Sequence, residues 1–239
     1  SELLDLVALG TVADLVKLDK NNRILVEYGL NRIRSGHACP GIQALFQISG
    51  RDTHYANTQD LGFSLGPRIN AAGRLEDISL GISCLMAEAL PQALQIAQQL
   101  NDINLQRKDI EQEIKFSAQS LLAKVDIEQR YTICLFDASW HHGVIGVVAS
   151  RIKESWYRPV IVFAPDEHGM LRGSGRSIPQ LHLRDALDAV SKLDPDVMVK
   201  FGGHAMAAGL TIRPEKFELF SNLFEQIVAN LLTPDDLHQ

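Results

Sequence analysis

The segment VKFGGHAMAAG, residues 199–209, combines residue types that can bring a ligand close to a bare backbone. Gly202 and Gly203 stand directly before His204, so the backbone next to this imidazole lacks side chains. Such glycines serve either a tight turn or the approach of a ligand to backbone N–H groups. For this segment alone the turn is the more common explanation, and both explanations stay open.

A second segment, RGSGRS at residues 172–177, mixes glycine, serine and arginine. Backbone N–H groups, the Ser174 hydroxyl and the Arg176 guanidinium together suit a phosphate oxyanion. Hairpin turns also use glycine and serine, so this motif is weak by itself. It gains weight if the two glycine-interrupted segments pair as strands and face one cleft.

Asp14 follows the apolar run LDLVALGTVA, which has the density of a buried strand. We predict a strand here that ends in a loop at residues 10–14. A carboxylate after a sheet strand lies where α/β proteins place ligands, and it can bind a metal ion. One carboxylate does not make a metal site, so spacing alone favours Asp14 as the cap of the following turn.

Two further segments carry polar residues whose role the sequence leaves open. GPRINAAGR places Arg68, Asn70 and Arg74 among small residues, as a surface loop or as a substrate-side lining between lobes. SWHHGVIG, residues 139–146, has adjacent histidines but no further zinc ligands nearby. We therefore favour an ordinary helix start with Trp140 packed, while a phosphate at this helix N-terminus stays open.

The composition bounds the kind of protein. The chain has 239 residues, 46% of them hydrophobic and 22% charged, which is typical of one large or two ordinary soluble domains. A net charge of −6 argues against a surface that grips nucleic acid all over, but it allows a local basic groove. No apolar run is long enough to span a membrane, and three scattered cysteines indicate a reducing compartment.

The elements that would position these residues change in kind along the chain. In the first part we predict helices at 21–36, 41–49 and 79–88, with an irregular glycine-rich segment at 59–77. A helix over 91–125 would be about 50 Å long and could join two lobes. After it, helices alternate with strands, which indicates an α/β domain with a mixed sheet. The strands are expected at 131–136, 159–165, 170–178, 196–201 and 207–213, and the helices at 143–156, 183–193 and 215–232.

Five segments in this order resemble one known family, the RecJ single-strand-specific 5′→3′ exonucleases of the DHH phosphoesterase superfamily. The resemblance covers nearly all of the chain, and five motifs in register are far more specific than any one. The segments are LVALGTVADLV, LGPRINAAGR, WHHGVIGVVASRI, RGSGRSI and KFGGHAMAAG.

The resemblance implies an α/β architecture in three parts. Residues 1–90 correspond to the tail of a DHH-type catalytic domain, 91–125 to a long connecting helix, and 126–239 to a DHH-associated substrate-binding domain with a mixed sheet. The family binds two Mn²⁺ or Mg²⁺ ions. Asp14, in GTVAD, matches the last metal-binding aspartate of its catalytic domain.

The resemblance also assigns substrate contacts. Ser174, Arg176 and His204 match residues that hold the substrate phosphate or terminal nucleotide, and Gly202 and Gly203 would let that nucleotide approach the backbone. In the linking segment, three residues match the lining of the DNA path: Arg68, Asn70 and Arg74.

This sequence departs from the family pattern in its metal ligands. The earlier catalytic motifs are absent, including Asp-His-His itself, and the Trp-His-His at 140–142 lacks the preceding aspartate. Because a buried strand is predicted at the very start, we expect further sequence upstream of residue 1. The chain alone is expected to bind single-stranded DNA weakly and not to cut it.

The implied function is hydrolysis of single-stranded DNA from its 5′ end, releasing 5′-mononucleotides during recombination and repair. The expected location is the bacterial cytoplasm, with no membrane association, and the expected partners are a single-strand-binding protein and a helicase. One alternative is an oligoribonuclease or cyclic-dinucleotide phosphodiesterase of the same superfamily, which would act on short RNA. Another is a non-catalytic nucleic-acid-binding module, against which the GTVAD segment counts.

Overall fold

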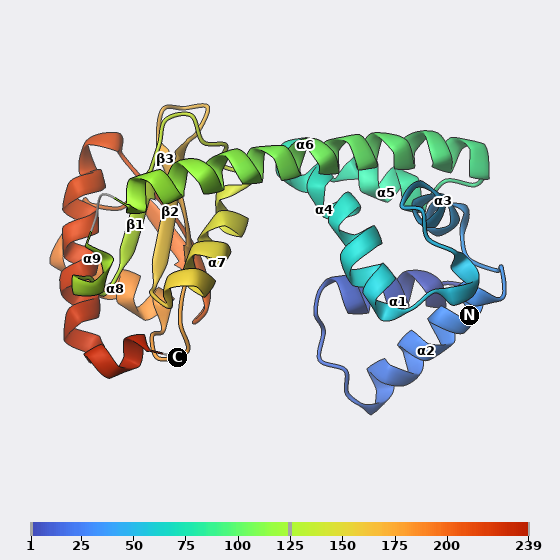
Figure 1. Ribbon diagram of the computed structural model, residues 1–239, viewed down its shortest axis with the longest axis horizontal. Coiled ribbons are helices and arrows are strands. Elements are labelled where there is room, and N and C mark those ends of the chain that lie inside the picture. Colours follow the sequence, from blue (N-terminus) through green and yellow to red (C-terminus); the bar gives the residue numbers. More distant parts are fainter. Residues whose placement is uncertain (1, 124–125, 239) are drawn as a thin grey trace. The chain divides into compact units, whose positions relative to one another are not determined.

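A computed structural model of the chain describes residues 2–123 and 126–238 (Figure 1). The chain forms two units, residues 1–108 and 109–239. The boundary falls within the longest helix, α6 (Leu90–Leu122), which is therefore shared by both units. Its predicted last residue, Val125, lies outside the described residues. The division of the chain at 90 and 125 stays a prediction.

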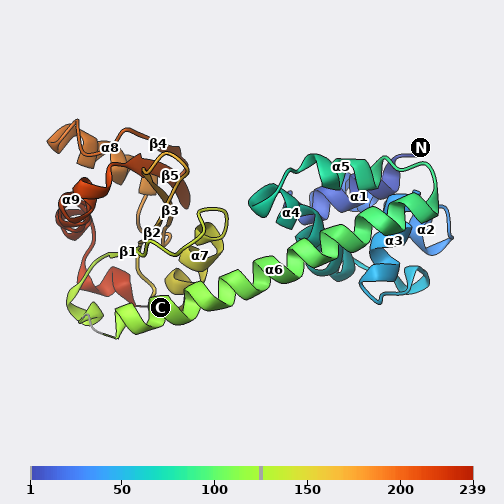
Figure 2. The ribbon, with the colours of Figure 1, turned by 90° about the horizontal axis from the view of Figure 1, so that it is seen from above.

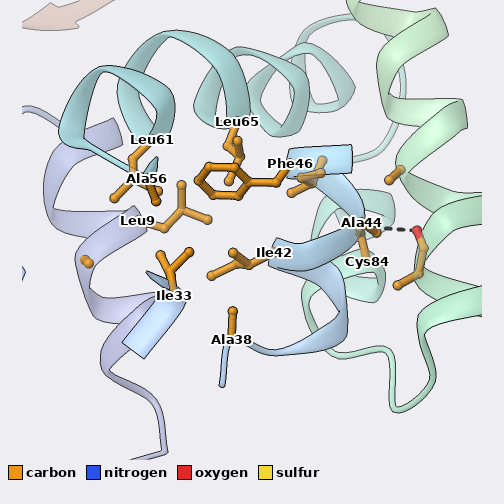
Figure 3. Close-up of a cluster of buried hydrophobic side chains, with 14 of the residues drawn as sticks. Leu9, Ile33, Ala38, Ile42, Ala44, Phe46, Ala56, Leu61, Leu65 and Cys84 are labelled. Atoms are coloured by element: carbon orange, nitrogen blue, oxygen red, sulfur yellow. Dashed lines mark hydrogen bonds between the residues drawn. The ribbon is translucent and has the colours of Figure 1, made fainter. Parts of the chain in front are cut away.

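The first unit is helical in its described part. A cluster of buried side chains from its α-helices and the π-helix forms its core, with Leu9, Ile33, Phe46 and Leu65 among the members (Figure 3). The elements before α6 are α1 (Leu4–Ala13), α2 (Lys20–Arg34), α3 (Pro40–Ile48), the 3₁₀ helix η1 (Thr53–Tyr55), the π-helix η2 (Asp60–Leu65), α4 (Gly66–Leu75) and α5 (Ser79–Leu85).

The strand predicted at the start of the chain is wrong, because these residues form helix α1. The buried residues Asp5, Ala8 and Leu9 have helical spacing. Leu3 and Val7 are apolar but exposed, so they hide that period in the sequence. An unbroken apolar run does not by itself distinguish a buried strand from a helix.

The segment 59–77 is also more regular than predicted, since it forms η2 and α4 in direct succession. Pro67 lies in the first turn of α4, where proline is favoured because no intrahelical N–H bond is lost. Gly66 packs against α1, and a Cβ there would lie 3.1 Å from the Ala13 Cβ. Here glycine serves close packing rather than an irregular backbone.

The predicted helices at 21–36, 41–49 and 79–88 are confirmed as α2, α3 and α5, with shifted ends. The N-cap of α2 is Asp19, whose carboxylate accepts a hydrogen bond from the Asn22 N–H at 2.9 Å. The Asp19 N–H in turn donates to the Lys17 carbonyl in the loop before the helix.

The second unit contains a mixed five-stranded sheet, which confirms the predicted α/β class. The strand order is β1-β2-β3-β5-β4, with β1 and β2 parallel and the remaining pairs antiparallel. The strands are β1 (Ile133–Phe136), β2 (Val160–Pro165), β3 (Leu171–Arg176), β4 (Lys200–Gly203) and β5 (Ala207–Ile212). Short 3₁₀ helices lie at η3 (Ile127–Gln129), η4 (Pro214–Lys216) and η5 (Pro234–Leu237).

Helices cover the two faces of this sheet unequally. α7 (Ile145–Trp156) packs on β2 and β3 from one side, while α8 (Leu183–Leu193) and α9 (Phe217–Leu231) lie on the other (Figures 1 and 2). The α8–α9 side holds the apolar core, where Phe163, Leu210 and Phe220 are buried. The β5 and β4 end of the α7 face is left more open, and Lys200 and Gly209 are exposed there.

Candidate functional site

The sheet brings the two glycine-interrupted segments together, and the predicted pairing is confirmed. Residues 207–209 of VKFGGHAMAAG lie on β5 and pair with RGSGRS on β3, while Gly202 and Gly203 lie on β4, on the other side of β5. In register, Ser174 lies opposite Gly209, and Gly209 lies opposite Gly202. Residues in one such row point to the same face of a sheet. The row therefore presents one hydroxyl followed by two bare backbone positions.

Arg176 and His204 extend this arrangement by two rows, past the row of Gly175, Ala208 and Gly203. Arg176 lies opposite Ala207, and the His204 N–H donates to the Ala207 carbonyl at 2.8 Å. Alternate residues of a strand share a face, so Arg176 points to the same side as Ser174. The His204 side chain is exposed. The structure thus places four predicted residues within three successive rows: Ser174, Arg176, Gly202 and His204.

Gly202 and Gly203 differ in role, although the sequence treats them alike. Both belong to strand β4 rather than to a turn. A Cβ at Gly202 would meet no atom within 4 Å, whereas one at Gly203 would lie 2.5 Å from the Ala207 carbonyl oxygen. Gly203 also has φ +145°, a backbone conformation that essentially only glycine adopts. The backbone conformation and close packing of β4 therefore require glycine at residue 203. At residue 202 the absence of a side chain leaves open space beside the strand.

The Arg176 guanidinium is held in place by its neighbours. Its Nη1 donates to the Ser174 Oγ at 3.2 Å and to the Gly175 carbonyl at 2.8 Å. Its Nε donates to the Ser150 Oγ of α7 at 3.1 Å. A planar guanidinium beside a hydroxyl and an open backbone row has the donors that a phosphate group needs.

Sequence reasoning missed three residues of this arrangement. Gly209 is the middle position of the row, and it was visible only as a further glycine after His204. Gly146 and Ser150 lie on α7 and reach the β3 side chains through tertiary packing. Gly146 lies beside Ser174 and Arg176, and Ser150 is hydrogen-bonded to Arg176. The sequence offered only a weak signal for Gly146, a small residue at a helix start.

The Trp-His-His segment behaves as the sequence favoured. Trp140 is buried, and α7 begins only at Ile145, after the histidines. The His141 and His142 rings stack with centroids 4.9 Å apart. Burial, followed by repulsion from His142, lowers the pKa of His141, whose Nδ1 accepts a hydrogen bond from the Gly143 N–H. These histidines order the loop before the helix.

In the first unit, Asp14 lies at the C-terminal end of helix α1 and not after a strand. Asp14 and Asn70 both line a cavity of about 370 Å³ whose other walls are largely apolar. The C-terminal end of a helix carries partial negative charge, so the helix and the Asp14 carboxylate would both stabilise a cation bound there. The predicted cap of the following turn is not seen among the hydrogen bonds of Asp14, whose N–H bonds Gly10 within α1.

The three polar residues of α4 do not form one lining. Asn70 and Arg74 are four residues apart and share a helix face, while Arg68 lies on another side. The Arg68 Nη1 donates to the Ser64 carbonyl at 2.6 Å, and its Nε donates to Asn101 of α6. Burial, with repulsion from Arg51, lowers the pKa of Arg68. The helix therefore brings Asn70 to Asp14 and engages Arg68 in packing.

Residues 2–123 and 126–238 contain no group of three or more His, Cys, Asp or Glu side chains that could hold a metal ion. Asp14 alone does not supply the ligand number that Mn²⁺ or Mg²⁺ requires. The described part of the chain therefore does not fit a complete metal site. In the same part, no helix is long and apolar enough to cross a membrane.

Comparison with known proteins gives a consistent result. The DHHA1 domain model matches residues 128–230, within the second unit. The chain is 52% identical over 237 residues to the single-stranded-DNA-specific exonuclease RecJ of Salmonella typhimurium, and 50% identical over 238 residues to that of Escherichia coli. Both alignments cover 98% of this chain. The chain matches the C-terminal part of the RecJ catalytic core.

The RecJ fold matches as well. The crystal structure of Thermus thermophilus RecJ in complex with Mg²⁺ superimposes with a TM-score of 0.84 at 32% identity, covering 97% of this chain and 35% of that one. A second structure of this RecJ contains Mn²⁺. The chain spans 41% of the length of the Salmonella and Escherichia RecJ proteins.

Proposed function

We propose that the second unit holds the 5′-terminal phosphate of single-stranded DNA in a RecJ-type exonuclease. In this proposal the exonuclease hydrolyses phosphodiester bonds from the 5′ end and releases 5′-mononucleotides. The observation that carries the proposal is the Ser174–Arg176 pair beside the open Gly209–Gly202 row. Relatives named as single-stranded-DNA-specific exonucleases support the choice of substrate.

Each residue of this surface has a definite part in the proposal. The Arg176 guanidinium balances the phosphate charge, and the Ser174 hydroxyl gives a further donor. Gly202 and Gly209 let the terminal nucleotide lie against the sheet. His204, exposed at the end of β4, contacts the same nucleotide. Together these groups bind and orient the strand end, which places the scissile bond for attack.

The metal chemistry of the proposal rests on the resemblance to RecJ and not on this chain's described residues. A divalent ion would activate water and stabilise the leaving oxygen. Within residues 2–123 and 126–238, Asp14 is the ligand that the resemblance to RecJ assigns. A DNA path along Arg68, Asn70 and Arg74 stays a prediction, and of these three only Asn70 lines the same cavity as Asp14. The cytoplasmic location, the repair role and the partner proteins also remain predictions.

The phosphate site predicts that Arg176→Ala weakens binding of a 5′-phosphorylated single-stranded oligodeoxynucleotide by roughly tenfold to a hundredfold, since a charge-assisted contact is lost. Fluorescence anisotropy with matched 5′-phosphorylated and 5′-hydroxyl oligonucleotides measures this. The variant should also lose the preference for the phosphorylated end. A short 5′-phosphorylated RNA tests the oligoribonuclease alternative.

Arg172→Ala is the matched control, because Arg172 is an exposed arginine on the same strand and is paired with Asp166 at 3.6 Å. It removes the same charge two residues from the site, so it should reduce affinity for both oligonucleotides slightly and equally. Equal affinity of the unchanged chain for both oligonucleotides contradicts the proposal. So does an equal loss from both arginine variants.

For the chain alone we expect no mononucleotide release from 5′-phosphorylated single-stranded DNA in Mn²⁺. A single carboxylate binds a divalent ion poorly, and no ligand cluster exists in the described residues. This finding favours binding without cleavage as the second candidate function. Chromatography of the reaction products, with Asp14→Ala as the control, provides the measurement. Release that Asp14→Ala abolishes would mean that the chain carries a complete metal site.

A further inference from the structure

We propose that Ser150 is a positioning residue, which orients the Arg176 guanidinium from helix α7. The inference rests on the proposed function, in which Arg176 holds the 5′-phosphate. Ser150 does not belong to the glycine-rich segments, and it would act only through Arg176. It lies in the second turn of α7 and is half-buried against the sheet.

The hydrogen bonds of Ser150 have a fixed direction. Its hydroxyl donates to the Gly146 carbonyl one turn earlier, at 3.1 Å. A serine hydroxyl has one proton, so only its lone pairs remain, and these accept from the Arg176 Nε at 3.1 Å. Ser150 can therefore face the cationic side chain only as an acceptor, which suits a guanidinium.

The Arg176 guanidinium is held by hydrogen bonds to two of its nitrogens, which come from two different elements. Ser150 holds the Nε from α7, while Ser174 and the Gly175 carbonyl hold the Nη1 from β3. Contacts on two different nitrogens define the orientation of a planar group. A side chain that is already oriented loses less freedom when a ligand binds, so affinity rises without a new contact.

Gly146 makes this arrangement sterically possible. A Cβ at Gly146 would lie 3.0 Å from the Ser174 Oγ and 3.1 Å from the Arg176 Nη2. Gly146 and Ser150 are four residues apart, so both lie on the face of α7 that packs on β3. The bare position admits the arginine, and the hydroxyl one turn later orients it.

Helix stability does not explain a serine at this position. Serine is neutral to unfavourable inside helices, and back-bonding to the preceding turn destabilises a helix slightly. Alanine at residue 150 should therefore leave α7 as stable as before. A role in orienting Arg176 predicts a loss of affinity without a loss of stability, and this separation can be measured.

The test measures binding of a 5′-phosphorylated single-stranded oligodeoxynucleotide to the whole chain. Ser150→Ala should weaken binding roughly five- to tenfold, because a partner of a charged group is removed. Ser150→Thr keeps the hydroxyl and should stay within about twofold of the unchanged chain. Ser155→Ala is the matched control, since the exposed Ser155 hydroxyl donates to the Arg151 carbonyl on the same helix, as Ser150 does to Gly146; it should change nothing.

Two readouts separate this role from a general structural effect. Thermal unfolding of the Ser150→Ala chain should match that of the unchanged chain. In nitrogen-15 NMR spectra the Nε–H signal of Arg176, assigned by its loss in Arg176→Ala, should exchange faster with water in Ser150→Ala and stay protected in Ser150→Thr.

The outcomes distinguish failure of the inference from failure of the proposed function. If Arg176→Ala weakens binding and Ser150→Ala does not, the positioning role is overturned and the phosphate site stands. If Arg176→Ala has no effect on binding, both are overturned. Equal losses from Ser150→Ala and Ser155→Ala, or no rescue by threonine, also overturn the positioning role.

Discussion

Gly203→Ala should destabilise the second unit by roughly 3 kcal/mol or more, because backbone strain and steric overlap add together. At φ +145° an L-residue is strained, and the new Cβ would lie 2.5 Å from both the Ala207 carbonyl oxygen and the Ala208 Cα. Both neighbours are backbone atoms of a paired strand, so neither moves without breaking the β4–β5 ladder. Denaturant unfolding followed by tryptophan fluorescence measures the loss, since both tryptophans, Trp140 and Trp156, belong to this unit.

Gly202→Ala is the control for this prediction and a test of ligand approach. Its Cβ meets no atom of the protein, so stability should change by no more than about 1 kcal/mol, with alanine favoured in a strand. The same Cβ would fill the open row beside Gly209, so affinity for the 5′-phosphorylated oligonucleotide should fall. Equal destabilisation by the two substitutions would contradict the separate roles of the two glycines.

Gly29→Ala should cost the first unit about 3 kcal/mol or more, since the substitution forces two packed helices apart. A Cβ at Gly29 of α2 would lie 2.2 Å from the Leu4 carbonyl oxygen and 2.5 Å from the Ala8 Cβ, both on α1. Hydrogen exchange of amides in the first unit measures the change. Because Asp14 directly follows α1 as its C-cap residue, displacement of this helix would also move the carboxylate in its cavity.

Gly10→Ala gives the opposite result for the same chemical change. Gly10 lies inside α1, and a Cβ there would meet nothing within 4 Å. Alanine is the better helix former, so stability should rise by about 0.5–1 kcal/mol. If Gly10→Ala destabilised as much as Gly29→Ala, the close crossing of α1 and α2 would not be the cause.

Much of the fold follows from local pattern. The long helix, the later strands and the helices between them have clear periods, and a mixed sheet follows from their alternation. Three predictions failed where local pattern is silent. The apolar run at α1 has no visible period, so its helix was predicted as a strand. The glycines of α4 serve packing and do not mark an irregular segment. The strand predicted to begin at residue 196 begins only at Lys200, although Val197 and Met198 before it are buried.

The candidate site was predictable only in part, for the same reason. Segments that combine several functional residue types, such as RGSGRS, can be recognised from the sequence alone. Ser150 does not, because its importance depends on the side chain that reaches it from another element. Gly202 and Gly203 are identical in the sequence, and only the backbone angle and the neighbours of each one distinguish them.

The two faces of strand β3 have different roles, one in the apolar core and one in the candidate site. Gly173 and Gly175 lie against Phe163 and Leu183 of the apolar core, while Ser174 and Arg176 point to the opposite side. A shift in pairing by one residue would place the guanidinium in the core. That state is too costly to be populated. Formation of the sheet therefore also positions Ser174 and Arg176, the two residues proposed to bind phosphate.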